Sequence, residues 1–357
     1  MIFKKLELNN FRKIKSAKLE LHKGINIFYG DNAAGKTSIL EALWSFTGAK
    51  SFRGSKDTDL ISFGSEKANI KLYFLDNERE QECIINIEKH REAILNDVEY
   101  GPASKIAGKI NAIVFSPIDL NIIENGPTFR RKFLDTAICQ LYPSYLDIYK
   151  KYLRAVEQRN KILKDIKYNP MLLEFLEDFE NEISSFGAQI IDYREKFIEK
   201  LNKYLPNIYN GISLGKEKIE IFYETDASKQ KEKFKEKLKL LRDEDIKNIS
   251  TSIGPHRDDI DIKIDGISAR YFGSQGQKRS AAIALKLSES EVIYEITGKK
   301  PVALLDDVMS ELDTNRQNYI LNHIKDWQVF ITCCDKENFS SLKEGKIFEV
   351  KNGEIFS

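Results

Sequence analysis

The chain has 357 residues, 41% of them hydrophobic, which is enough to fill the core of one large domain or two ordinary ones. Its 56 basic and 55 acidic residues give a net charge of +1, which excludes a globally basic nucleic-acid binder but allows local basic patches. Four irregularly spaced cysteines do not fit a zinc site or a disulfide framework and suit a reducing cytoplasm. Because no apolar stretch approaches the roughly 20 residues of a membrane helix, we expect a cytoplasmic protein with no membrane partner.

Hydrophobic periodicity predicts strands and one helix in the first quarter of the chain. Apolar and polar residues alternate at 2–8, 17–21, 25–29, 70–74 and 83–87, with a helix at about 36–46. From 128 to about 210 the apolar residues recur at three- and four-residue spacing, which predicts helices, and a charged amphipathic segment follows at 229–242.

The last third of the chain returns to a mixed pattern. Strand-like runs occur at 260–264 and 269–272, and helix, strand, helix and strand then alternate at 275–296, 302–306, 315–324 and 329–332. This alternation indicates a parallel sheet. We therefore expect an α/β fold of two lobes built from 1–116 and 245–357, with an inserted, compact and mainly helical domain at 117–244.

The segment GDNAAGKT at 30–37 matches the phosphate-loop pattern G-x-x-x-x-G-K-[ST] in full, between a predicted strand and a predicted helix. In this pattern the glycines let the backbone wrap a phosphate, the lysine reaches the β- and γ-phosphate oxygens, and the threonine can bind Mg²⁺. The alternative is a glycine-rich turn that caps a helix. We expect ATP to be bound by Gly30, Asp31, Asn32, Ala33, Ala34, Gly35, Lys36, Thr37 and Ser38, with Lys36 also taking part in catalysis.

Two carboxylates follow the apolar strand predicted at 302–305. In an α/β nucleotide site this position holds a magnesium-bound acid, so we expect Asp306 to bind the metal together with Thr37. Asp307 is then placed to position or polarise the attacking water. An apolar strand followed by acids is common by itself, and the interpretation depends on the phosphate loop upstream.

The segment Ser274-Gln275-Gly276-Gln277 has two interpretations. Ser274, followed three residues later by Gln277 and then by an apolar helix pattern, is a capping box. A serine-capped helix N-terminus that contains glycine is also a phosphate-binding device, and this one precedes the acidic strand. Both interpretations use the same helix start.

In several segments the sequence resembles the RecF family of SMC-like ABC ATPases, nearly from end to end. The resembling segments are LNNFR at 8–12, FSP at 115–117, NGPTFRRKFLD at 125–135, GPHRDD at 254–259, FGSQGQKR at 272–279, LLDD at 304–307 and SELD at 310–313. One departure concerns the γ-phosphate: Thr332 and Cys333 stand where many ABC proteins place a sensing histidine.

The resemblance implies an ABC-type ATPase head and a site shared between two chains. Arg12 would reach ATP phosphates, and Ser274, Gly276 and Gln277 would contact the nucleotide held by a second copy, so that ATP and Mg²⁺ drive formation of a homodimer. The implied activity is a weak, DNA-stimulated ATPase that acts in recombinational repair and the SOS response. The implied partners are double-stranded DNA, single-strand to double-strand junctions, and mediator proteins of the RecR and RecO types.

Basic clusters are the only sign of DNA contacts in the residues themselves. We expect contacts from Arg130, Arg131, Lys150 and Lys151, although each cluster also fits an ordinary solvated surface. A different class, the nucleotide-binding subunit of a transporter, predicts a sensor histidine that the chain lacks. A nucleic-acid-cleaving enzyme predicts an appended acidic metal cluster, and none follows the last predicted strand.

Overall fold

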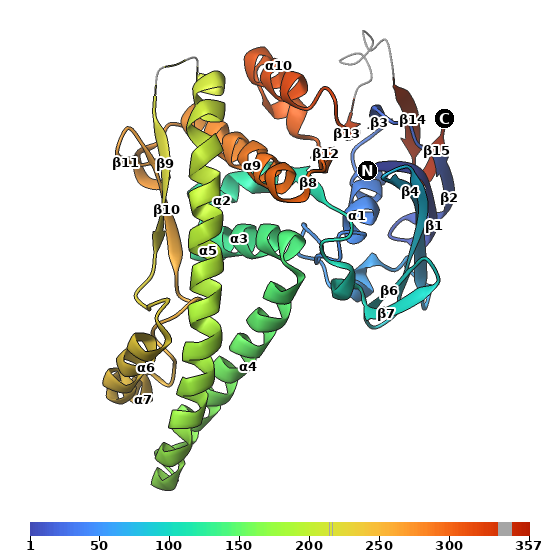
Figure 1. Ribbon diagram of the computed structural model, residues 1–357. Helices are drawn as coiled ribbons and strands as arrows, with labels where there is room; N and C mark the ends of the chain where they lie inside the picture. The colour runs from blue at the N-terminus through green and yellow to red at the C-terminus, as the bar shows by residue number, and fades with distance from the viewer. Residues whose placement is uncertain (214, 216, 335–344) are drawn as a thin grey trace. The chain divides into compact units, whose positions relative to one another are not determined.

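The computed structural model describes residues 1–213, 215, 217–334 and 345–357 (Figure 1). The chain forms two compact units. The first unit comprises Met1–Leu120, Asn207–Lys216 and Arg279–Ser357, and the second unit comprises Asn121–Pro206 and Glu217–Lys278. The domain boundaries predicted at residues 116 and 245 stay a prediction.

The first unit contains an antiparallel sheet of order β2-β1-β4-β5-β6-β7. Its strands are β1 (Ile2–Phe11), β2 (Ile14–Glu20), β4 (Ala68–Asp76), β5 (Arg79–Ile87), β6 (Arg91–Leu95) and β7 (Val98–Pro102). Alternate side chains of β1 and β4 are buried, as expected for a sheet with one face on the core. In register, Leu6 lies opposite Leu19 on one side and Leu72 on the other.

The second sheet of this unit is mostly parallel, with the order β15-β14-β3-β13-β12-β8. Its strands are β3 (Ile25–Tyr29), β8 (Ala112–Phe115), β12 (Val302–Asp306), β13 (Val329–Cys333), β14 (Lys346–Lys351) and the antiparallel edge strand β15 (Glu354–Phe356). Helix α1 (Lys36–Ser45) contributes Ile39 and Leu43 to the core between the sheets. Because Tyr29 pairs with Cys333, and Thr332 with Asp306, the segments that follow β3, β12 and β13 leave the same carboxyl edge.

The remaining elements of the first unit are short 3₁₀ turns and two helices. The turns are η1 (Asp57–Leu60), η2 (Ala103–Ile106), η3 (Pro117–Leu120) and η5 (Val308–Glu311). The two helices are α10 (Thr314–His323) and the part of α9 (Gln275–Thr297) from Arg279 onward, and the last residues of α5 (Leu176–Ser213), from Asn207 onward, also belong to this unit. Helix α9 is buried over much of its length, because its middle carries small and apolar residues on several faces.

The second unit combines helices with a three-stranded sheet of order β11-β10-β9. Its elements are α2 (Asn121–Glu124), α3 (Pro127–Leu141), α4 (Pro143–Asp165), η4 (Pro170–Phe175), α5 (Leu176–Ser213, of which residues up to Pro206 belong here), β9 (Ile219–Glu224), α6 (Lys231–Leu240), α7 (Arg242–Asn248), β10 (Asp259–Ile264), β11 (Ile267–Ser268) and α8 (Ala269–Phe272). Buried ion pairs join its elements: Arg159 pairs with Glu180 and Asp245, and Arg194 with Asp135.

The structure confirms the α/β fold class and most predicted elements, and it corrects one. Residues 269–272 form the short helix α8 where we expected a strand, because the hairpin after the turn at Asp265-Gly266 ends within two residues. Strands β6, β7, β8, β9, β14 and β15 were not predicted, although IEIFYE in β9 partly alternates. Among the described residues, no helix is long and apolar enough to cross a membrane.

Candidate functional site

The phosphate-loop segment joins the end of β3 to the start of α1, as the sequence predicts. Gly30 has a φ of 150°, and a Cβ added there would lie 2.2 Å from the carbonyl oxygen of Val350, so only glycine fits. Gly35, with a φ of 118°, precedes the first residue of α1. The loop therefore turns tightly, and the N-terminus of α1 points at the space that the loop encloses. This arrangement attracts anions.

Two lysines reach the carbonyl groups of this loop. Lys36 is buried and donates hydrogen bonds from Nζ to the carbonyl oxygens of Gly30 (2.7 Å) and Asp31 (3.1 Å). Lys13 donates to the carbonyl oxygen of Ala33 at 2.8 Å. The loop thus has two ammonium groups beside it, one of which, on Lys13, the sequence did not single out.

The acidic end of β12 is tied directly to the loop. The Thr37 hydroxyl donates to Asp306 Oδ1 at 2.7 Å, and the Thr332 hydroxyl lies 3.0 Å from the same oxygen. The main-chain N–H of Asp307 donates to Thr332 Oγ1 at 3.0 Å, while Asp307 itself has a left-handed φ of 54°. Burial raises the pKa of Asp306, and the hydrogen bonds from Thr37 and Thr332 oppose that shift.

The oxygens of Thr37 and Asp306 are hard ligands that suit Mg²⁺, and they already lie within hydrogen-bond distance of each other. Within the described parts of the chain, no group of three or more His, Cys, Asp or Glu side chains could hold a metal ion. Mg²⁺ commonly takes one or two protein ligands and completes its shell with phosphate oxygens and water.

A cavity of about 520 Å³ opens over the loop, within the size range of small-molecule sites. It brings together Arg12, much of the phosphate loop and Asp307. Its lining residues are Arg12, Lys13, Asn32, Ala33, Gly35, Lys36, Thr37, Ser38, Arg53, Asp59, Ile61, Phe63 and Asp307. The residues from 53 to 63 lie in a stretch without clear periodicity, so the sequence offered no signal that they belong to the site.

Arg12 has a left-handed φ of 55° and lines this cavity, but most of its donors are engaged within the protein. Its guanidinium donates to both carboxylate oxygens of Glu41, each at 2.9 Å. It also donates to Ser55 Oγ at 2.6 Å and to the Asp59 carbonyl oxygen at 2.8 Å. Glu41 is completely buried on α1 and also accepts a bond from Ser51. The sequence did not identify Glu41 as part of the site.

Thr332 and Cys333 are both buried and do not line the cavity. The Thr332 hydroxyl instead contacts the carboxylate of Asp306 and the main-chain N–H of Asp307. The next residue, Cys334, is exposed, and its Sγ lies 3.6 Å from Lys36 Nζ and 3.1 Å from Asn32 Oδ1. A thiol therefore lies beside the phosphate-loop lysine.

The segment from Ser274 to Gln277 belongs to the second unit and forms the start of α9. The Ser274 N–H donates to Gln277 Oε1 at 2.7 Å, and the Gln277 N–H donates to Ser274 Oγ at 3.2 Å, which confirms the capping box. Gln277 also donates to Glu217 at 2.7 Å. Ser274 remains exposed, so its hydroxyl is accessible to another molecule.

The four basic residues expected to contact DNA differ in exposure. Arg130 is buried and forms a bidentate pair with Asp259 at 2.6 and 2.7 Å, and it also donates to main-chain carbonyl oxygens. Because these partners engage its guanidinium inside the protein, we do not expect it to contact a DNA phosphate. Arg131 is half-buried and donates to the Asp258 carbonyl oxygen at 2.8 Å. Lys150 and Lys151 are exposed on α4.

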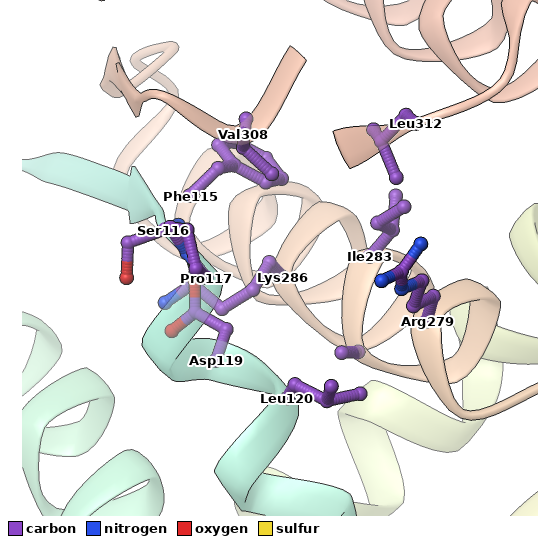
Figure 2. A pocket seen from close by; sticks show the side chains of 11 residues that line it. Phe115, Ser116, Pro117, Asp119, Leu120, Arg279, Ile283, Lys286, Val308 and Leu312 are labelled. Atoms are coloured by element: carbon purple, nitrogen blue, oxygen red, sulfur yellow. Dashed lines mark hydrogen bonds between the residues drawn. The ribbon is translucent and has the colours of Figure 1, made fainter. Parts of the chain in front are cut away.

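Figure 2 shows a second, much smaller pocket of the first unit, of about 40 Å³, where the turn after β8 meets α9. Pro117 and Leu120 face Ile283 and Arg279 of α9, and Leu312 and Val308, from the segment after Asp307, close the remaining side. The acidic strand end is thus packed, through the residues that follow it, against the same helix whose first turn carries the capping box.

Comparison with known proteins agrees with this geometry. Residues 2–355 match the RecF/RecN/SMC N-terminal domain family. The chain is 40% identical to the DNA replication and repair protein RecF of Agathobacter rectalis, and 38% identical to that of Clostridium perfringens, with 99% of each chain covered in both cases.

Solved structures of RecF are also similar to this chain. Two structures of the recombination mediator protein RecF in the RecFOR pathway, one with ATP and one with ATPrS, each have a TM-score of 0.92 at 37% identity, covering 99% of this chain and 97% of theirs. The Smc head domain of Pyrococcus furiosus, at 17% identity and a TM-score of 0.55, shares the fold. The chain belongs to the RecF family of SMC-like ABC ATPases.

Proposed function

We propose that this chain binds ATP with Mg²⁺, hydrolyses it slowly, and uses the bound nucleotide to form a homodimer on DNA during recombinational repair. The bond between Thr37 and Asp306 carries the first part of this proposal, because it joins the phosphate loop to the acidic strand end at the carboxyl edge of a parallel sheet. The cavity over the loop has the size that a nucleotide needs.

The proposed roles follow from these positions. The N–H groups at the start of α1 bind the phosphates, and Lys36 exchanges its bonds to the Gly30 and Asp31 carbonyls for phosphate oxygens. Thr37 and Asp306 hold Mg²⁺, which neutralises charge on the phosphates when bound. Asp307, which lines the cavity, accepts a hydrogen bond from the attacking water and orients it toward the γ-phosphate.

We expect this ATPase to be slow and stimulated by DNA. Asp307 is one methylene shorter than the glutamate of most ABC enzymes, so positioning of the water depends on closure of the site by a second copy. In that copy, Ser274, Gly276 and Gln277 contact the γ-phosphate, and the exposure of Ser274 supports this role. The capping box orders the helix start that would make the contact.

Arg131, Lys150 and Lys151 are the candidate DNA contacts that retain exposed surface, so we expect them to contribute backbone contacts to double-stranded DNA or to junctions. The likeness to a RecF of the RecFOR pathway supports mediator proteins of the RecR and RecO types as partners. Such a function places the protein beside DNA in the cytoplasm.

Titration with ATP and Mg²⁺ tests the proposal, with Lys36→Ala compared with Lys247→Ala, a matched change of an exposed lysine on α7. We expect Lys36→Ala to weaken ATP binding by about 100-fold, because it removes the ammonium that would face the phosphates, and Lys247→Ala to bind as wild type. Turnover should rise when duplex DNA is added. Equal ATP binding by both variants, or fast turnover by the monomer without DNA, would contradict the proposal.

A further inference from the structure

A Gly-Pro-His-Arg turn begins at Gly254 in the second unit and is held from several sides. Gly254 has a φ of 119°, and a Cβ added there would lie 2.5 Å from the Tyr152 hydroxyl oxygen, so the position requires glycine. The carbonyl oxygen of Pro255 accepts a hydrogen bond from the buried Arg194 side chain at 2.7 Å. The turn is therefore a rigid support for the residue that ends it, Arg257.

Arg257 is exposed, and its main-chain N–H donates to the Gly254 carbonyl oxygen at 2.7 Å. Its guanidinium donates from Nη2 to Ser250 Oγ at 2.6 Å and from Nε to the Thr251 carbonyl oxygen at 3.4 Å. Because both partners are neutral, they orient the guanidinium without cancelling its charge. Its Nη1 has no partner among the residues that the structure describes, so this ordered cation can still donate to another molecule.

A second guanidinium lies beside the first. Arg131 of α3 donates from Nη1 to the carbonyl oxygen of Asp258, the residue that follows Arg257, at 2.8 Å. Burial lowers the pKa of His256 to about 4, and the positive charges of both arginines add to this shift, which places both near its ring. Since His256 is then neutral at neutral pH, the positive charge at this place belongs to the two arginines.

These two arginines differ from the buried arginines of the same unit in having no carboxylate partner. Neither forms an ion pair with any residue in the described part of the chain, and Arg131 bonds otherwise to Thr128 Oγ1 at 3.4 Å. The neighbouring carboxylate of Asp258 is buried and accepts a hydrogen bond from the Tyr223 hydroxyl. Two adjacent guanidiniums that lack counter-charges repel each other, and an anion held between them removes that repulsion. Four other arginines of this unit have carboxylate partners: Arg130, Arg159, Arg194 and Arg242.

We propose that Arg257 and Arg131 form a phosphate-binding pair for the backbone of double-stranded DNA, with one phosphate group held between the two guanidiniums. This inference rests on the proposed DNA-binding function and deepens it, because it adds Arg257 and gives Arg131 a partner. Lys150 and Lys151 are exposed on α4, directly before the Tyr152 that packs against the turn. A chain of evenly spaced phosphates can contact several of these cations at once, which a single carboxylate cannot do.

The test measures binding of a short DNA duplex to the full chain, with ATP and Mg²⁺ present, by fluorescence anisotropy over a range of salt concentrations. We expect Arg257→Ala and Arg257→Gln each to weaken binding about 10-fold and to lower the slope of log affinity against log salt by about 1, because one phosphate contact is lost. Arg257→Lys, which keeps the charge, should retain the slope. Lys196→Ala removes an exposed cation of the same unit that is already paired with Asp192, and this matched control should bind DNA as wild type.

A double variant tests whether the two arginines hold the same phosphate. Arg257→Ala combined with Arg131→Ala should weaken binding by less than the product of the two single effects, because the second change removes a contact that is already impaired. An effect equal to that product would contradict the shared phosphate.

Two results for Arg257 would overturn the inference while leaving DNA binding by the wild type intact. One is an affinity of Arg257→Ala within about twofold of wild type at an unchanged salt slope. The other is a weaker affinity at an unchanged salt slope, which would mean that Arg257 only supports the turn. If the wild-type protein binds no DNA in the presence of ATP, the proposed DNA-binding function fails together with its phosphate-binding pair.

Discussion

The ion pair between Arg12 and Glu41 allows a quantitative prediction about the stability of the first unit. Glu41 is completely buried, while the Arg12 side chain keeps 19% of its surface exposed. Arg12→Ala leaves the Glu41 carboxylate in the core without its bidentate partner, and we expect a cost of about 3 kcal/mol in unfolding free energy. Glu41→Ala leaves an arginine that still bonds to Ser55 and to the Asp59 carbonyl oxygen, and should cost about 2 kcal/mol.

The double variant should lose only about 3 kcal/mol of unfolding free energy, less than the roughly 5 kcal/mol sum of the single changes. Both charges are absent from the double variant, so no unpaired charge remains in the core. Urea unfolding followed by tryptophan fluorescence measures this, since Trp44, on the same helix as Glu41, and Trp327 both lie in the first unit. Independent sites usually add to within about 0.5 kcal/mol. If the loss of the double variant equals the sum of the two single losses to within that margin, the coupling between Arg12 and Glu41 is refuted. The same variants test Arg12 as a phosphate contact. Under conditions in which both proteins are fully folded, Arg12→Ala should bind ATP less tightly than wild type.

Three further outcomes follow from the site and from the second unit. Asp306→Asn should lower ATP hydrolysis by about 100-fold or more, measured by phosphate release at saturating ATP, whereas unchanged turnover would remove Asp306 from the metal site. Alkylation of Cys334 should block ATP binding, since its thiol lies 3.6 Å from Lys36 Nζ, and Cys334→Ser should resist; equal sensitivity of both proteins would argue against it. Burial lowers the pKa of His256 to about 4. Between about pH 4 and 6.5 the unfolded chain therefore binds more protons at this residue than the folded chain does, and the free energy of unfolding falls as the pH drops through that window. His256→Asn should remove about 3 kcal/mol of this pH dependence in urea unfolding followed by circular dichroism, and an unchanged slope would contradict it.

Local patterns predicted the parts of the site that are continuous in sequence. The phosphate loop, the acidic end of β12 and the capping box at Ser274 each occupy a few neighbouring residues with a fixed spacing. The structure confirms the strand and helix around the loop, the strand that ends at Asp306, and the helix that begins after Ser274. Parallel pairing of β3, β13 and β12 then brings the first two together, as the alternating pattern near the end of the chain indicated.

Parts that depend on partners distant in sequence could not be predicted. Arg130 looked like a surface cation, but Asp259, 129 residues away, pairs with it in the interior. Glu41 looked like an ordinary helix residue until β1 placed Arg12 beside it. Phe63 follows a stretch without periodicity, and only the main-chain bonds to the end of β1 bring it to the cavity.

We propose that ATP joins two copies of this chain through Ser274, and sedimentation velocity with ATP, Mg²⁺ and DNA would reveal such a dimer. Wild type and Ser274→Thr, which keeps the hydroxyl and the helix cap, should sediment as dimers when ATP is present. Ser274→Arg should bind ATP with wild-type affinity and remain a monomer, because a long cation replaces the small capping hydroxyl at the expected contact. Dimers of Ser274→Arg at the protein concentrations at which wild type dimerises would contradict the proposed contact and leave Ser274 as a helix cap alone.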